Sequence, residues 1–403
     1  MLGRHVGLVA LVALGAAGLV AVGCGSDDAA PAPGNTSAGG TSASGGTGGT
    51  GGTGGSNAGG STTQGGAGGD TGTGGADTEE ACDQACLDKY TSKAGDGTAP
   101  EKPAGAPDGD GTAPTYFAVN RLFVGDTDFE GSPNPAAWKD IGFNIDGFTS
   151  DKNFAGQCKA LSKQAKTDIR TDGTNGIDNA FGNIIISQGT LPIENASQAA
   201  TGAIEEGSFS LVLKFANLGA GGDYGSVDAQ VIPVGMKDGI VPKFDKTDSW
   251  SPFNPSDSPP IDFKGGWVNK NTWVSGSKGT LPLSLEISGI KITLSIQQAQ
   301  ISATMNDDHT EITKGIIGGS LNTEALVTNL KAVAGSLNLC GAAFDSVAEQ
   351  IKQASDSLTV GGQDPTKTCD SISIGIGFKG KITGAPGDAL PKTEPKPDPC
   401  AGQ

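Results

Sequence analysis

The chain has 403 residues, of which 44 are acidic and 27 are basic, so its formal net charge is −17. This charge argues against nucleic acid as a partner and against electrostatic docking on anionic lipid, because both need a basic surface. His309 is the only histidine after residue 5, which excludes a metal site with several histidine ligands beyond that point. A Ser-His-Asp arrangement would therefore have to use His309.

Residues 1–23 have the pattern of a bacterial lipoprotein signal peptide. Arg4 and His5 precede an apolar run without polar residues from Val6 to Gly23, and Ala21-Val22-Gly23-Cys24 resembles a lipobox. We therefore expect cleavage before Cys24 and acylation of that cysteine, with a retained anchor helix as the alternative. Several acyl chains anchor a protein stably in a membrane, where a single chain does not. Gly25 lacks the acidic character of inner-membrane retention signals, which favours the outer membrane or cell surface.

The chain then divides by composition. Residues 24–78 are rich in Gly, Thr and Ser and cannot bury enough apolar surface to offset the entropy of ordering. They predict a flexible spacer with an end-to-end distance of about 40 Å. Residues 79–93 form a short helical segment with two cysteines, 94–114 a second linker, 115–384 the main domain, and 385–403 a Pro-rich tail.

The main domain shows apolar residues at every second position, which is typical of strands with one buried face. The clearest examples lie at 209–215, 281–287, 290–296, 299–305 and 372–378. Helical spacing appears at about 323–337 and 341–358, and a shorter helix is expected at about 194–205. The pattern predicts a mainly β fold, a large antiparallel β-sandwich of jelly-roll type with two or three helices packed on it.

Six cysteines follow Cys24, and an even number in an exported chain indicates disulfide bonds. We predict a bond from Cys340, at the start of the second long helix, to Cys369, just before the final strand. Cys82, Cys86, Cys158 and Cys400 would then pair among themselves. Their pairing stays open, except that a bond between Cys82 and Cys86 within one helix is not expected.

Several segments of the main domain resemble a group of uncharacterised lipoproteins of myxobacterial type, which share a Gly/Thr-rich spacer after the lipid-bearing cysteine. The resemblance implies the architecture and the envelope location, and it implies no chemistry. The matching segments are 125–128, Trp138, 144–147, 172–179, 272–276 and 363–369.

Two acidic loops are candidates for calcium. Asp126, Asp128 and Glu130 alternate before a glycine, as oxygen ligands of a hard cation do, with Asp146 as a remote ligand. Ala137 occupies the place where an EF-hand needs its bidentate Glu, so a strict EF-hand is excluded. Residues 172–179 form a second loop of this type, although Arg170 and Thr171 stand where ligands would be wanted. The alternative for both loops is a set of turns and helix caps.

A possible ligand face lies on one expected strand, where Trp267, Asn269, Asn271 and Trp273 alternate. Aromatic rings interleaved with amides suit the stacking and hydrogen bonding of a glycan, with Trp250 as a third wall. The alternative is that the tryptophans belong to the core and the asparagines end strands.

Signals for catalysis are weak. Ser275-Gly276-Ser277-Lys278 fits a loose nucleophile pattern without its companion motifs, and Asp307-Asp308-His309 reads as a polar hairpin turn. Glu286 is the first carboxylate to test for glycoside hydrolysis. We therefore expect no catalytic residues and a lipid-anchored, calcium-stabilised, monomeric binding module for a glycan. A hydrolase, or a structural surface protein without a small ligand, is the alternative.

Overall fold

The computed structural model describes residues 82–161, 171–237, 239–276, 278–287, 290–392 and 400. The expected signal peptide, the lipidation site Cys24 and the Gly/Thr-rich spacer lie outside the described residues. Within the described part, no helix is long and apolar enough to cross a bilayer.

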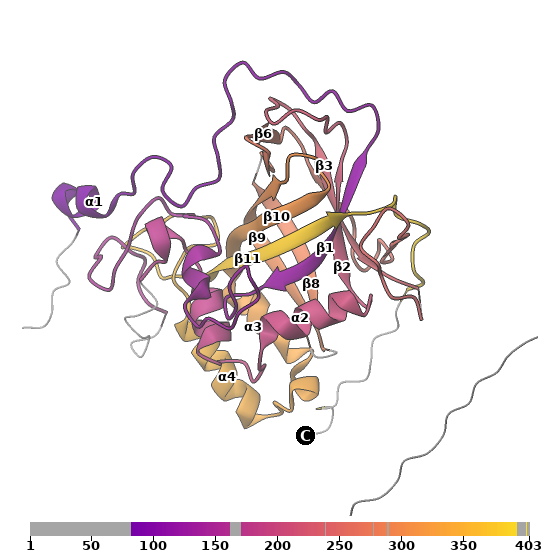
Figure 1. Cartoon of the computed structure of the whole chain (residues 1–403). Coiled ribbons are helices and arrows are strands. Elements are labelled where there is room, and N and C mark those ends of the chain that lie inside the picture. The colour runs from indigo at the N-terminus through magenta and orange to yellow at the C-terminus, as the bar shows by residue number, and fades with distance from the viewer. Residues whose placement is uncertain are drawn as a thin grey trace, which may run out of the picture. The chain divides into compact units, whose positions relative to one another are not determined.

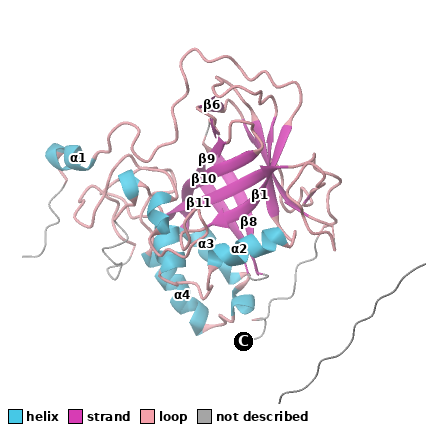
Figure 2. Cartoon of the chain, viewed as in Figure 1, coloured by secondary structure: helices cyan, strands magenta, loops and turns pink. Residues whose placement is uncertain are grey.

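A single antiparallel sheet dominates the fold (Figures 1 and 2). Its main path runs β4-β3-β2-β1-β11-β10-β9-β7-β6, while β5 pairs with β3 and β8 pairs with β9. The mainly β prediction is confirmed. The strands are β1 (Thr115–Phe123), β2 (Ser210–Phe215), β3 (Ala229–Gly235), β4 (Ser251–Pro252), β5 (Ile261–Phe263), β6 (Trp267–Asn269), β7 (Thr272–Val274), β8 (Gly279–Ile287), β9 (Ile290–Met305), β10 (Glu311–Asn322) and β11 (Ser371–Ile382).

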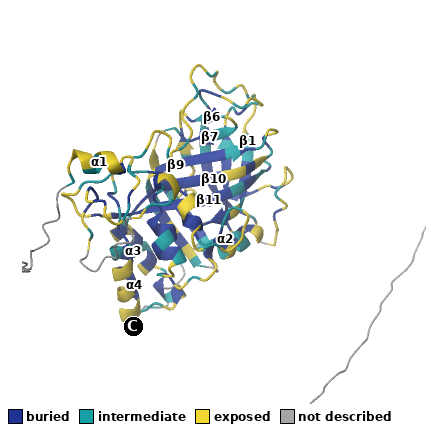
Figure 3. Ribbon diagram, turned by 60° about the vertical axis from the view of Figure 1, so that its left-hand side comes forward, coloured by how far each residue is buried: buried dark blue, intermediate teal, exposed yellow. Residues whose placement is uncertain are grey.

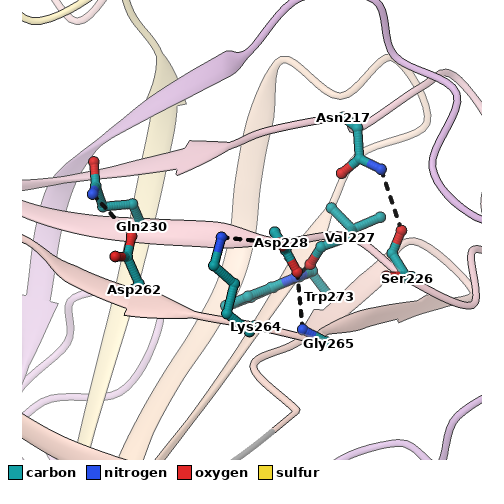
Figure 4. A network of polar contacts seen from close by, with 9 residues as sticks. All are labelled: Asn217, Ser226, Val227, Asp228, Gln230, Asp262, Lys264, Gly265 and Trp273. Atoms are coloured by element: carbon teal, nitrogen blue, oxygen red, sulfur yellow. Dashed lines mark hydrogen bonds and ion pairs between the residues drawn. The ribbon is translucent and has the colours of Figure 1, made fainter.

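The expected two-sheet sandwich is not confirmed, because the described strands form one curled sheet, a half-barrel. The long strand β9 pairs with β10 along one side, and with β8 and then β7 along the other. The Trp273 ring from β7 meets the rings of Phe215 and Phe263, with centroids 5.1 Å and 6.5 Å away. Its Nε1 donates to the Val227 carbonyl (2.9 Å), within the polar network that Figure 4 shows. The curl thus buries one concave face, where a sandwich would bury a second sheet.

Four α-helices accompany the sheet in the described residues: α1 (Gln84–Tyr90), α2 (Ala196–Glu205), α3 (Thr323–Lys331) and α4 (Ala342–Gln353). The three helices expected in the main domain are confirmed, with shorter bounds. Helix α2 contacts β1 and β8, and α3 contacts β9 and β10. Short turns of other helix types are η1 (Ala137–Asp140), η3 (Thr174–Gly176), η4 (Phe181–Ser187) and η5 (Ala334–Leu337).

The main core fills the concave face of the sheet, beneath these helices (Figure 3). The alternating residues Ile372, Ile374, Ile376 and Phe378 of β11 are all buried there, as the period-two pattern predicts. Burial of a large aliphatic or aromatic side chain contributes roughly 1.5–3 kcal/mol. A smaller cluster around Trp250, with Ala118 and Val212, covers the outer face.

Glycines on β10 and β11 let another segment cross the outer face closely. A Cβ at Gly375 would overlap the Ile141 carbonyl, and one at Gly318 would lie 2.7 Å from the Phe143 ring. Residues 137–145 therefore pass directly over these two strands. This crossing carries the following loop to the edge of β11, where the candidate site lies.

Three disulfides join Cys82 to Cys86, Cys158 to Cys369 and Cys340 to Cys400. The predicted bond between Cys340 and Cys369 is wrong, although both cysteines form disulfides. Cys369 instead pairs with the segment that a bridge between Lys159 and Thr368 holds beside it. The bond from Cys82 to Cys86 forms because α1 begins only at Gln84, so Cys82 precedes the helix and folds back onto its first turn.

Candidate functional site

The first acidic loop does not gather around a common point. The Asp126 carboxylate accepts hydrogen bonds from the Ser197 amide (3.3 Å), from its hydroxyl and from the Thr127 hydroxyl, so it caps the N-terminus of α2. Asp128 Oδ1 accepts from the amides of Glu130 (3.0 Å) and Ser132 (2.9 Å), which is an Asx-type turn. The structure does not bring these carboxylates together with Asp146. In this structure the carboxylates of Asp126 and Asp128 serve as cap and turn residues, and calcium at this loop stays a prediction.

Asp146 instead lies with Asp172, Asp178 and Asp356, which we call the four-aspartate cluster. Each of Asp172 and Asp178 experiences the charge of Asp146 and Asp356, and a hydrogen bond joins the side chains of Asp172 and Asp178. The second acidic loop therefore supplies Asp172 and Asp178 to this site, and Asp146, which the sequence suggested as a remote ligand of the first loop, joins them. Asp356, in the segment between α4 and β11, completes it.

Backbone amides hold three of these carboxylates in place. Ile145 donates to Asp178 Oδ2 (2.8 Å), Phe148 to Asp146 Oδ1 (2.8 Å), and Ser150 to Asp172. Ile145 ends the crossing segment, and Phe148 and Ser150 belong to the loop that follows it. The chain path over Gly375 thus determines where the carboxylates lie.

The fourth carboxylate is fixed at the free edge of β11. The Ser373 amide donates to Asp356 Oδ1 (2.7 Å) and the Ser373 hydroxyl to Oδ2 (2.6 Å). Strand β1 pairs with β11 only from Gly377 onward, so the earlier residues of β11 offer unpaired amides on that side. Asp356 and Asn179, whose Oδ1 accepts from the Gly375 amide (2.9 Å), satisfy these amides.

Gln363 connects the two halves of the cluster. Its Nε2 donates to Asp146 Oδ2 (2.9 Å) and to the Asp356 carbonyl (3.0 Å). Its Oε1 accepts from the Cys158 amide (3.0 Å), next to the disulfide to Cys369. The disulfide therefore positions Gln363 and, through it, two of the aspartates.

Burial and mutual repulsion favour the neutral forms of the cluster. Desolvation, followed by the charge of Asp146, raises the pKa of Asp172 to about 8. Desolvation also raises the pKa of Asp356 to about 7, and it raises that of the fully buried Asp178 well above the ordinary value. Among the described residues, no Lys or Arg forms an ion pair with any of the four. Without a bound cation, these raised pKa values favour retention of protons by the cluster near neutral pH.

The chemistry of the cluster suits a hard cation, since carboxylate oxygens are the ligands that calcium prefers. Asp178 is buried, while Asp146, Asp172 and Asp356 keep partial solvent exposure. The buried Ser150 hydroxyl has no hydrogen-bond partner, and its own amide binds Asp172. In the described part of the chain, no three acidic, histidine or cysteine side chains already stand in an ion-binding arrangement. Binding would therefore require side-chain rotations.

The expected tryptophan face does not form. Trp273 and Trp250 are fully buried on opposite faces of the sheet, so neither can stack on a ligand. Trp267 is partly exposed, but its Nε1 donates to the Pro100 carbonyl (2.9 Å), and Asn269 donates to the Glu101 carbonyl (2.7 Å). These side chains fasten the segment that the sequence had suggested as a linker.

The candidate catalytic residues have structural partners. His309 is 7% exposed in the β9–β10 turn, with Nδ1 2.8 Å from the Gly219 carbonyl and Nε2 3.3 Å from Asn271 Oδ1. The Asn271 amide donates to Asp307 (3.0 Å), which completes the polar turn. The buried Ser275 hydroxyl accepts from the Ile301 amide (3.1 Å). Neither Ser275 nor His309 is therefore poised for nucleophilic catalysis.

No protein-family model, no curated protein and no solved structure matches this chain.

Proposed function

We propose that the protein is a non-catalytic binding module of the cell envelope, held there by acyl chains on Cys24, and that calcium in the four-aspartate cluster stabilises its fold. The resemblance to myxobacterial lipoproteins belongs to the same proposal. The supporting observation is the gathering of four carboxylates without a basic partner among the described residues. A divalent cation would supply the missing positive charge.

The proposal that calcium stabilises the fold is supported by the residues around the cluster. Its carboxylates accept hydrogen bonds from the loop at Ile145–Ser150 and from β11, so an ion there would join loop and sheet. That is a stabilising role, in which the ion binds the folded state and not the unfolded chain. The structural partners of His309 and Ser275 support a function without catalysis.

Calcium titration of the chelator-treated protein by calorimetry tests the metal proposal. Wild-type protein is expected to bind calcium, and Asp172→Asn is expected to weaken binding at least tenfold, because it removes one charged ligand. Asn can still accept from the Ser150 amide and donate to Asp178, so the fold should persist. The matched control is the double variant Asp126→Asn with Asp128→Asn, which should bind as the wild type does. Absence of binding to wild type, or loss of binding in the control alone, contradicts the proposal.

The anchor is tested at Cys24, which lies outside the described residues. Changing Cys24→Ser is expected to leave an uncleaved precursor or to release soluble protein, because the processing enzymes need the thiol. Metabolic labelling with palmitate and fractionation of the membranes provide the measurement. If the Ser variant is still processed and labelled, the anchor lies elsewhere.

A further inference from the structure

An open cleft of about 820 Å³ lies between α2, the end of β1 and residues 126–135, and we call it the α2 cleft. Its volume falls in the range of roughly 300–1,000 Å³ that small-molecule sites occupy. None of the tryptophans proposed from the sequence lines it. The sequence alone did not indicate this cleft, because residues far apart in the chain form it.

The inner wall of the α2 cleft is held rigidly. The Ser197 hydroxyl donates to Asp126, and the Ser187 hydroxyl donates to the Gly125 carbonyl (3.0 Å). The Thr201 hydroxyl accepts from the Leu122 amide (3.2 Å). These polar groups already form hydrogen bonds within the protein, so they fix the shape of the cleft and are not free to bind a ligand.

Four other polar side chains in the lining have no hydrogen-bond partner among the residues that the structure describes. The side chains of Arg121, Asn195, Gln198 and Glu205 line the cleft and form no hydrogen bond or ion pair with any residue that the structure describes. All four end in a planar group, which is a guanidinium, an amide or a carboxylate. Together they provide both donors and acceptors. Apolar surface from Ile186, Ile193 and Pro133 lies in the same lining.

We infer that the α2 cleft binds a neutral carbohydrate, an inference that rests on the proposed binding function. Planar polar groups can bridge two adjacent hydroxyls, and the apolar lining can receive the C–H face of a sugar ring. Asp126 and Glu205 outnumber Arg121 among the charged residues of the cleft, which disfavours an anionic sugar. The Asp126 carboxylate is occupied by Ser197 and Thr127, so the two acids do not form a free catalytic pair.

Saturation-transfer NMR and calorimetry with neutral hexasaccharides of glucose, mannose and N-acetylglucosamine test this inference, with hexagalacturonate as the anionic comparison. At least one neutral hexasaccharide is expected to bind the full folded chain. The double variant Arg121→Ala with Gln198→Ala should weaken its binding at least tenfold. Both side chains are exposed and unbonded, so the variant should keep its melting temperature. The control is Lys237→Ala with Gln353→Ala, neither of which lines the cleft.

The outcomes separate this inference from the proposed function. Binding that the cleft variant leaves unchanged overturns the assignment to the α2 cleft but keeps the carbohydrate-binding module. Tighter binding of hexagalacturonate, or no binding of any neutral hexasaccharide, overturns the ligand class. Cleavage of a bound hexasaccharide, with loss of cleavage in Glu205→Gln but not in Glu206→Gln, overturns the non-catalytic function while it keeps the cleft as the site.

Discussion

Replacing both Cys158 and Cys369 with alanine is expected to lower the free energy of unfolding by roughly 5 kcal/mol, in the chain-entropy model of disulfide stabilisation. The two cysteines are 211 residues apart, so their bond removes more conformational entropy from the unfolded chain than either of the other two disulfides does. Both are buried together with Leu358, which adds a loss of packing. Denaturant unfolding of wild type and variant at one pH provides the measurement.

The other two disulfides supply the controls. Cys340 and Cys400 are 60 residues apart, for which the same model gives roughly 4 kcal/mol, and Cys82 and Cys86 are only 4 apart. The order of destabilisation should therefore follow the sequence separation. A variant of Cys158 and Cys369 that is the least destabilised of the three would contradict this account.

The same disulfide affects the four-aspartate cluster. The Cys158 amide donates to Gln363, and Gln363 in turn holds Asp146 and the carbonyl of Asp356. Loss of the bond frees the segment that positions Gln363. Formation of this disulfide and assembly of the four-aspartate cluster are therefore coupled.

Local patterns predicted the elements well. The alternation over 372–378 places β11 with its apolar residues buried, and the helical spacing over 323–337 and 341–358 locates α3 and α4. Alternation specifies which side chains share a face, but it does not specify which strand pairs with which. The curl of the sheet depends on β9, whose one side meets β8 and then β7. That pairing is a long-range property, so the sequence suggested a sandwich instead.

The sequence predicts only part of the candidate site, because the contacts that assemble the site are also long-range. Asp172 and Asp178 lie in a loop that the sequence marks as acidic and Gly-rich, whereas the sequence groups Asp146 with Asp126 as a remote ligand. Their true grouping follows from the passage of residues 137–145 over Gly375 and Gly318. Asp356 follows α4 without any motif, and only its hydrogen bonds to Ser373 reveal its role. The prediction of a ligand face fails for Trp250 and Trp273 because both side chains are buried in the core.

In the absence of calcium, the protein is expected to lose stability as the pH rises from 5 to 7. Asp172 and Asp356 have pKa values of about 8 and about 7 in the folded state, because of desolvation and neighbouring charge. Both values lie above the roughly 3.9 of an unfolded Asp. Between these limits the folded state holds protons that the unfolded chain releases. Stability is therefore greatest at low pH and falls as the pH rises toward the folded pKa values.

The expected size follows from proton linkage. Each extra proton on the folded state costs about 1.4 kcal/mol of stability for each pH unit, so one retained proton accounts for about 2.7 kcal/mol between pH 5 and pH 7, and two for up to about 5 kcal/mol. A hydrogen bond with Thr366 lowers the pKa of Asp364 to about 2. Titration of Asp364 therefore changes the stability only at more acidic pH. Calcium needs the ionised carboxylates, so its addition should reverse the trend by stabilising the protein most at pH 7.

Urea unfolding in a chelator at pH 5, 6 and 7, repeated with excess calcium, measures both slopes. Asp172→Asn removes one titrating group and should flatten the calcium-free slope, whereas Asp126→Asn should leave that slope unchanged because Asp126 caps α2 away from the cluster. If the calcium-free wild type is equally stable at pH 5 and pH 7, the cluster does not retain its protons. The four carboxylates would then be charged and separately solvated, and they would have no need of a cation.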